Sequence, residues 1–95
     1  MAILVHAVLD GITTEQYDTL NARLQSTPEI FDGCLAHACV STESGLEIFD
    51  LWESEGKMQA FAEKMMPVAT SLGWPDGPRP RVAEVHNHWV PGAAG

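Results

Sequence analysis

Two strand-like segments stand back to back in the middle of the chain, over residues 34–41 and 46–53. The four residues between them, Thr42-Glu43-Ser44-Gly45, are polar and end in a glycine, which is typical of a β-hairpin loop. Strands joined by such a short loop are antiparallel neighbours in one sheet. Any fold open to this chain must therefore be built around a central hairpin.

A helix is predicted on each side of this hairpin. Thr13 and Gln16 have the spacing of a capping box, and apolar residues at helical spacing then predict a helix over 14–25. After the hairpin, Ser54 can cap a second helix, whose apolar stripe is the clearest in the chain: Met58, Phe61, Ala62, Met65 and Met66. Pro67 is expected to break or kink this second helix.

One further strand is predicted toward each end of the sequence. Residues 2–9 are apolar on both alternating faces, and residues 81–90 alternate as a final strand after a proline-rich loop over 74–80. The resulting order is βαββαβ, that of ferredoxin-like folds, with the first and third strands central. We therefore expect an α+β fold with a four-stranded antiparallel sheet, as a single domain over 1–90 with a flexible tail at 91–95.

This arrangement leaves one face of the sheet without a cover. Two helices can cover only one face of four strands, yet the first strand has no polar side to present to water. A second copy of the same sheet is the simplest cover for the remaining face. The pattern therefore predicts a homodimer that pairs through its sheet faces.

Composition excludes several kinds of partner. The 95 residues include five Lys and Arg against thirteen Asp and Glu, a net charge of −8 with histidines neutral. Nucleic acids and anionic membranes are bound chiefly through basic side chains, so neither is expected as a partner. The opening apolar run is short and contains a histidine, so we expect neither a signal peptide nor a spanning helix.

The two cysteines, Cys34 and Cys39, are five residues apart on one strand. At that spacing they are expected to point to opposite faces and to lie too far apart for a disulfide. A reduced pair of this kind favours a cytoplasmic protein.

The hairpin also brings polar residues together. If its loop has an even number of residues, His37 lies opposite or diagonal to Asp50, on a face shared with Cys39 and Trp52. A histidine beside an aspartate can be held in one tautomer and made more basic, as a general base requires. His37 and Asp50 are therefore candidate catalytic residues, with Trp52 as a flat wall for an aromatic ligand. The alternative is a pair that serves packing and strand register alone, and an odd-numbered loop would separate the two residues.

The other histidines support a weaker hypothesis of a metal site. His86 and His88 would share a face of the last strand, and His6 lies on the first strand, its expected neighbour. Such a set could chelate zinc or copper, but no further ligand can be placed beside it except Glu84. Surface or interfacial histidines are the favoured interpretation, and no metal is expected.

Two stretches resemble the antibiotic-biosynthesis-monooxygenase type of dimeric α/β barrel. The first is FDLWESEGKMQAF at 49–61, where an aromatic residue ends the third strand and an acidic-Ser-acidic run starts the helix; the second is VAEVHNHW at 82–89. The resemblance implies a pocket between sheet and helices in each subunit and a dimer formed by the sheet faces. It is specific for the fold and weak for function, because this superfamily also holds isomerases, haem-degrading enzymes, stress proteins and proteins without known activity.

Cofactor-free members that oxidise aromatic polyketides use a third-strand Trp, and Trp52 is the matching residue here. The resemblance thus implies a cofactor-independent monooxygenase for phenolic substrates, in which Phe61, Met65 and His86 join Trp52 in binding a small aromatic ligand. Phe61 stands where other members carry a helix histidine, and without that iron ligand haem degradation is not expected. A non-enzymatic ligand-binding or stress-type barrel and an isomerase on the same scaffold remain alternatives.

Overall fold

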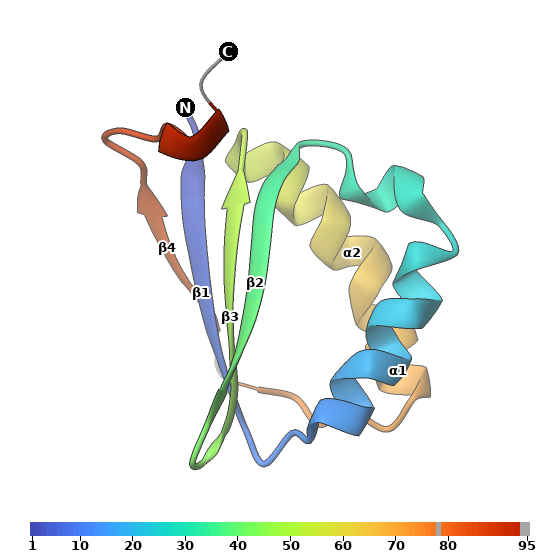
Figure 1. Cartoon of the computed structure of the whole chain (residues 1–95). Coiled ribbons are helices and arrows are strands. Elements are labelled where there is room, and N and C mark those ends of the chain that lie inside the picture. The colour runs from blue at the N-terminus through green and yellow to red at the C-terminus, as the bar shows by residue number, and fades with distance from the viewer. Residues whose placement is uncertain (78, 94–95) are drawn as a thin grey trace.

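The computed structural model describes residues 1–77 and 79–93 and shows one antiparallel sheet beside two helices (Figure 1). In chain order the elements are β1 (Ile3–Asp10), α1 (Thr14–Gln25), the 3₁₀ helix η1 (Pro28–Phe31), β2 (Cys34–Thr42), β3 (Gly45–Trp52), α2 (Glu55–Ser71), β4 (Arg81–Glu84) and the 3₁₀ helix η2 (Pro91–Ala93).

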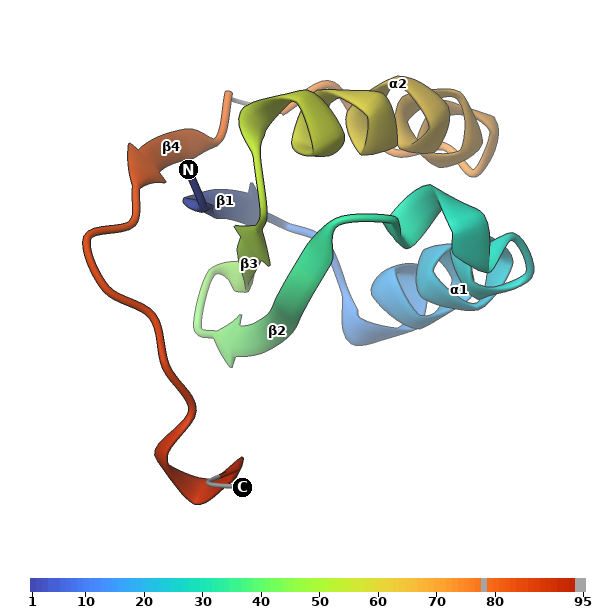
Figure 2. The same cartoon turned by 90° about the horizontal axis from the view of Figure 1, so that it is seen from above.

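The sheet has the strand order β2-β3-β1-β4, and every neighbouring pair is antiparallel. β1 and β3 are the central strands, as predicted. Both helices lie on the same side of the sheet, here called the helix face, and the opposite side is the open face (Figure 2). The predicted βαββαβ order with a four-stranded antiparallel sheet is confirmed.

Both helices begin at the residues that the sequence indicates. The Thr13 hydroxyl accepts a hydrogen bond from the backbone N–H of Gln16 (3.1 Å), and the Gln16 side-chain oxygen accepts one from the backbone N–H of Thr13 (2.9 Å). At α2, the Ser54 hydroxyl accepts the backbone N–H of Lys57 (3.2 Å). Each cap satisfies donors that the first helical turn leaves without a partner.

The expected break at Pro67 does not occur, since α2 continues through it to Ser71. A proline inside a helix removes one backbone hydrogen bond, which normally interrupts the helix. Here the residues on both sides of Pro67, including Met65 and Val68, pack into the same apolar cluster, while Pro67 itself is exposed. Burial on both sides keeps the helix in one piece.

Two buried clusters form the core on the helix face. Ile3, Val5 and Trp52 belong to the sheet cluster, and Leu20, Leu24 and Ala69 to the helix cluster. Phe61 of α2 packs against both clusters. The core is therefore continuous from the sheet to the pair of helices.

The hairpin loop is shorter than expected but has the required parity. Thr42 pairs with Gly45, so that only Glu43 and Ser44 lie between the strands. Gly45 has a φ of 152°, and a Cβ added there would lie 2.4 Å from the backbone oxygen of Leu9. Only glycine lets the end of the hairpin approach β1 so closely.

The structure corrects the expectation that the two cysteines point to opposite faces. Cys34 pairs with Trp52. A β-bulge between Cys34 and Ala36 then inserts one extra residue into β2, and beyond it Cys39 pairs with Ile48. Because the bulge reverses the alternation once, both cysteines lie on the helix face. Both thiols are free.

The last strand is shorter than predicted, because β4 ends at Glu84 and not at Val90. Glu84 pairs with Ile3, the first residue of β1, so an antiparallel continuation runs past the start of its partner. The Val85 N–H still donates to the Ala2 oxygen (2.9 Å), and the chain then leaves the sheet. Of the tail expected at 91–95, η2 covers the first three residues, and residues 94–95 lie outside the described part, as does residue 78 of the predicted loop.

None of the helices in the described part of the chain combines the length and the apolar composition needed to cross a membrane.

Candidate functional site

Three polar side chains form a line of hydrogen bonds on the helix face. His37 Nδ1 lies 2.5 Å from Asp50 Oδ1, and its Nε2 lies 2.5 Å from the Tyr17 hydroxyl. We call these three residues the proton relay. The structure thus brings together the two predicted catalytic residues and adds a third residue to them.

Each residue of the relay is held by a different element. His37 and Asp50 are directly paired across β2 and β3, so their contact follows from the hairpin register. Tyr17 comes from the first turns of α1, where its N–H donates to the Thr13 oxygen (3.0 Å). Its ring lies parallel to that of His37, with 6.0 Å between ring centroids and 5° between planes.

The relay has a defined direction when His37 is neutral. The Asp50 side chain is 12% exposed and acts as an acceptor, so it holds the imidazole proton on Nδ1. Nε2 is then an acceptor, to which the Tyr17 hydroxyl donates. The hydrogen bond that His37 donates to Asp50 raises the pKa of His37 above its ordinary value, although burial acts against this rise.

Tyr17 is the donor in this arrangement because it stays protonated at neutral pH. Burial raises the pKa of its hydroxyl, and the charges of Cys39, Asp50 and Asp18 raise it further. The Tyr17 hydroxyl therefore keeps its proton while it is hydrogen-bonded to His37 Nε2, and the Asp50 carboxylate stands where it would stabilise an imidazolium at His37. The His37 side chain is 40% exposed, so the relay can be reached from solvent at the edge strand β2.

The aromatic residues expected to bind a ligand lie in the core behind the relay. Trp52 is 1% exposed, with its ring centroid 5.1 Å from that of Phe61, and Met65 packs in the neighbouring helix cluster. The buried indole Nε1–H of Trp52 has no hydrogen-bond acceptor. An unpaired buried donor is unfavourable, and an oxygen atom brought to it would remove that cost.

His86 lies apart from the relay, since it is exposed and follows the end of β4. The metal hypothesis required His86 and His88 to share one face of the last strand. Because β4 ends at Glu84, neither histidine belongs to that strand. His6 instead lies 2.7 Å from Glu47 through its Nε2 and stacks on Phe49 of the open face. Among the described residues no group of three or more His, Cys, Asp or Glu could hold a metal ion.

Tyr17 is the site residue that sequence reasoning missed. It precedes Leu20 and Leu24 at helical spacing, which indicated only that it faces the core. The available signal was chemical, because a tyrosine on an inward-facing stripe needs a partner for its hydroxyl. His37 on the facing sheet supplies that partner.

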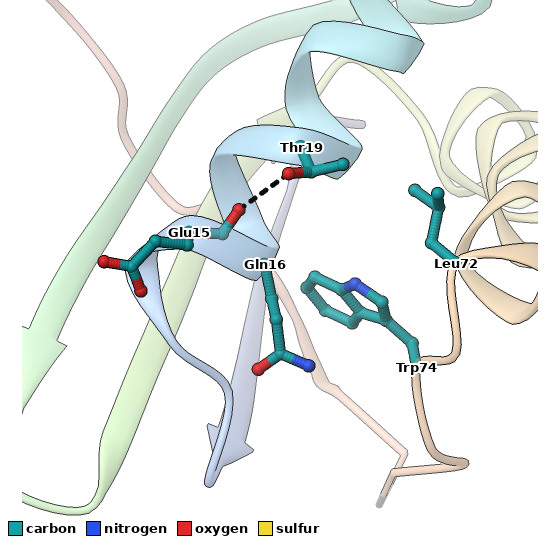
Figure 3. A pocket seen from close by; sticks show the side chains of 5 residues that line it. All are labelled: Glu15, Gln16, Thr19, Leu72 and Trp74. Carbon is teal, nitrogen blue, oxygen red and sulfur yellow. Dashed lines mark hydrogen bonds between the residues drawn. The ribbon is translucent and has the colours of Figure 1, made fainter.

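Two hollows lie outside the relay. One, of about 210 Å³, lies between α1 and the turn after α2 (Figure 3), and is lined by Glu15, Gln16, Thr19, Leu72 and Trp74. The other, of about 410 Å³, lies on the open face. His37 is also among the residues that line this second hollow, although its side chain is hydrogen-bonded to Tyr17 and Asp50 on the opposite side of the sheet.

Comparison with known sequences identifies no relative, since no protein-family model and no curated protein matches the chain. Solved structures do match it. Protein YJCS aligns with 90% of this chain and 100% of its own length, at a TM-score of 0.64 and 11% identity. A dimeric ferredoxin-like protein of unknown function from Thermobifida fusca aligns with 87% of this chain and 88% of its own, at a TM-score of 0.57 and 14% identity.

A third match has a described activity. The monooxygenase ActVA-Orf6 of Streptomyces coelicolor, solved with the ligand Nanaomycin D, aligns with 95% of this chain and 90% of its own length. The TM-score is 0.56 and the identity is 16%. The chain has a ferredoxin-like fold. At this level of identity the likeness concerns the fold alone, and it agrees with the resemblance to the antibiotic-biosynthesis-monooxygenase type.

Proposed function

We propose that the protein is a cofactor-independent monooxygenase that acts on small, neutral phenolic aromatic compounds. The observation that carries this proposal is the proton relay, in which a histidine is oriented by an aspartate and hydrogen-bonded at its other nitrogen to a hydroxyl. A phenolic substrate presents the same group to Nε2 as Tyr17 does. The shared fold with a monooxygenase supports the proposal at the level of the scaffold.

The first step is removal of a proton from the substrate hydroxyl. Neutral His37 accepts this proton at Nε2, either directly or through the Tyr17 hydroxyl, and Asp50 stabilises the resulting imidazolium. The product of this step is an electron-rich phenolate. Carbon at the position para to the oxygen then carries part of the negative charge and can react with dioxygen.

The second step uses dioxygen as the only oxidant. It forms a bond to the para carbon and gives a hydroperoxide, to which His37 returns its proton. Loss of water then breaks the O–O bond and removes the remaining hydrogen from that carbon, which becomes a carbonyl group. One oxygen atom enters the product, the other leaves as water, and the phenol is oxidised to a quinone.

The surroundings of the relay suit a neutral aromatic substrate. A net charge of −8 disfavours anionic ligands. Trp52, two residues from Asp50 on β3, packs against Phe61 in the core, and Met65 packs beside Phe61, so the side of the relay that faces the core is apolar, which favours an aromatic substrate over a polar one. His86 is exposed and follows the end of β4, so we leave it outside the proposed site.

We also propose that the protein works as a homodimer that pairs through the open faces. Apolar side chains remain accessible there, including Leu4 at 40%, Val8 at 37% and Val40 at 40% exposure. Apolar side chains exposed together on one face of a sheet favour an interface there. A dimeric protein among the structures that share the fold supports the same arrangement.

Oxygen uptake with anthrone, whose enol form is a polycyclic phenol, tests the proposed chemistry. The wild-type chain is expected to consume one dioxygen for each anthraquinone formed. His37→Ala should lower the rate at least about 100-fold, the lower end of what a positioned base contributes. Glu63→Gln, an exposed acidic position on α2, is the control and should keep the wild-type rate.

Three outcomes would contradict the proposal. A His37→Ala protein with the wild-type rate would exclude the relay as the base. Conversion of a bound phenolic compound without oxygen consumption would identify an isomerase, and saturable binding without conversion would identify a ligand-binding protein.

A further inference from the structure

The open face carries a hollow of about 410 Å³ that one subunit leaves unfilled. Apolar side chains from three strands form its floor, and the segment that follows β4 forms its rim. The floor residues are Leu4, Ala36, Ala38, Phe49 and Leu51, the rim residues are Val85, Asn87 and His88, and His37 completes the lining. Figure 2 shows this segment leaving β4 and running past the side of the sheet that the helices do not cover.

The residue after this rim is the most exposed aromatic side chain of the described part. Trp89 is 67% exposed, and Val90 beside it is 58% exposed. In the single subunit Trp89 does not enter the hollow, although its neighbour His88 borders it. A large apolar side chain in water next to an unfilled apolar hollow is an arrangement that association would remove.

We infer that Trp89 of each subunit occupies the open-face hollow of a second copy of this chain. The inference rests on the sheet-face pairing proposed above and is independent of the proposed chemistry. It identifies the C-terminal segment as the part of the partner that fills the hollow.

Symmetry favours a second copy over any other occupant. A two-fold interface uses the same patch of both subunits, so each patch must contain both a projection and its complement. Here the projection, Trp89, and the hollow adjoin on one face of one chain. A single two-fold axis can therefore place the indole of each subunit in the hollow of the other. Both hollows are then filled, and no patch remains for a third copy.

The chemistry of the hollow matches an indole side chain. Its volume lies in the range of cavities that take organic ligands, and its floor is apolar, as burial of an aromatic ring requires. Asn87 and His88 at the rim supply acceptors for the indole N–H, which seeks a partner when buried. Buried tryptophans dominate the energetics of many interfaces.

Sedimentation velocity of the full chain over a range of concentrations tests the inference. Trp89→Ala removes the projection, and Ala38→Phe fills the hollow from its floor. Each is expected to raise the dimer dissociation constant at least about tenfold. Met66→Ala is the matched control, because Met66 is an exposed apolar side chain on α2, away from the open face, and should leave the constant unchanged.

Tryptophan fluorescence gives a second readout that does not depend on the hollow variant. Trp52 is buried and Trp74 half-buried in the single subunit, so association should change the surroundings of Trp89 most. Wild-type emission is expected to move to shorter wavelength as concentration rises, and Trp89→Phe should lack this shift.

The outcomes separate the inference from the proposals that precede it. A Trp89→Ala protein that dimerises like the wild type would overturn the inference and leave the sheet-face pairing in place. A wild-type chain that is monomeric at every concentration would overturn both. Neither result depends on whether the protein consumes oxygen.

Discussion

At the scale of the residue, the behaviour of His37 depends on Asp50. Asp50→Asn removes the charge that favours the imidazolium but leaves the burial that opposes it. We therefore expect the pKa of His37 to fall, as measured by NMR titration of its ring protons. Asp76→Asn, an exposed loop position, is the control and should leave the titration as in the wild type. An unchanged His37 titration in Asp50→Asn would mean that the two side chains do not interact in solution.

The raised pKa of His37 also links pH to stability and to rate in opposite directions. Because the folded state favours the protonated imidazole, its contribution to stability is complete below the ordinary pKa of 6.5 and is lost as pH rises through the raised value. The proposed reaction needs the neutral base, so its rate should rise over that same interval. In Asp50→Asn the rise in kcat/KM is expected at lower pH, and a rise at the wild-type pH would exclude His37 as the titrating group.

At the scale of the element, the cap of α1 supports the turn that carries Tyr17. Thr13→Ala removes the acceptor for the Gln16 N–H and should lower the free energy of unfolding by about 1 kcal/mol. For a domain of roughly 100 residues this corresponds to a fall in Tm of about 4–8 °C. Thr14→Ala changes the exposed neighbouring threonine, for which we find no cap contact, and is the control for thermal unfolding. Equal Tm values for the two variants would contradict the role of the cap.

Elements with local signals were predictable from sequence, and contacts that depend on several elements were not. The even-numbered hairpin loop predicted that His37 lies opposite or diagonal to Asp50, and the structure pairs the two residues directly. The bulge after Cys34 has no signal in the alternation of apolar residues, so the predicted orientation of that cysteine was wrong. Tyr17 meets His37 only because α1 packs over β2, a placement that depends on the core and not on the helix sequence.

At the scale of the whole molecule, our proposals assign a different role to each face of the sheet. β2 serves both of them, because its residues alternate between the faces. His37 and Cys39 face the helices, whereas Ala36 and Ala38 form part of the floor of the open-face hollow. Assembly through the open face would therefore fix β2, which is an edge strand in the single subunit. It would also fix His37, the base of the proposed reaction.

The charge of the whole molecule opposes this assembly in a way that salt can reveal. Two copies that each carry −8 repel one another, while contact between apolar faces does not depend on charge. Raising ionic strength from about 0.01 M to about 0.15 M shortens the screening length from about 30 Å to about 8 Å and weakens that repulsion. The dimer dissociation constant measured by sedimentation velocity should therefore fall as sodium chloride is added. A rise would mean that complementary charges hold the subunits together, and that the apolar open face is not the interface.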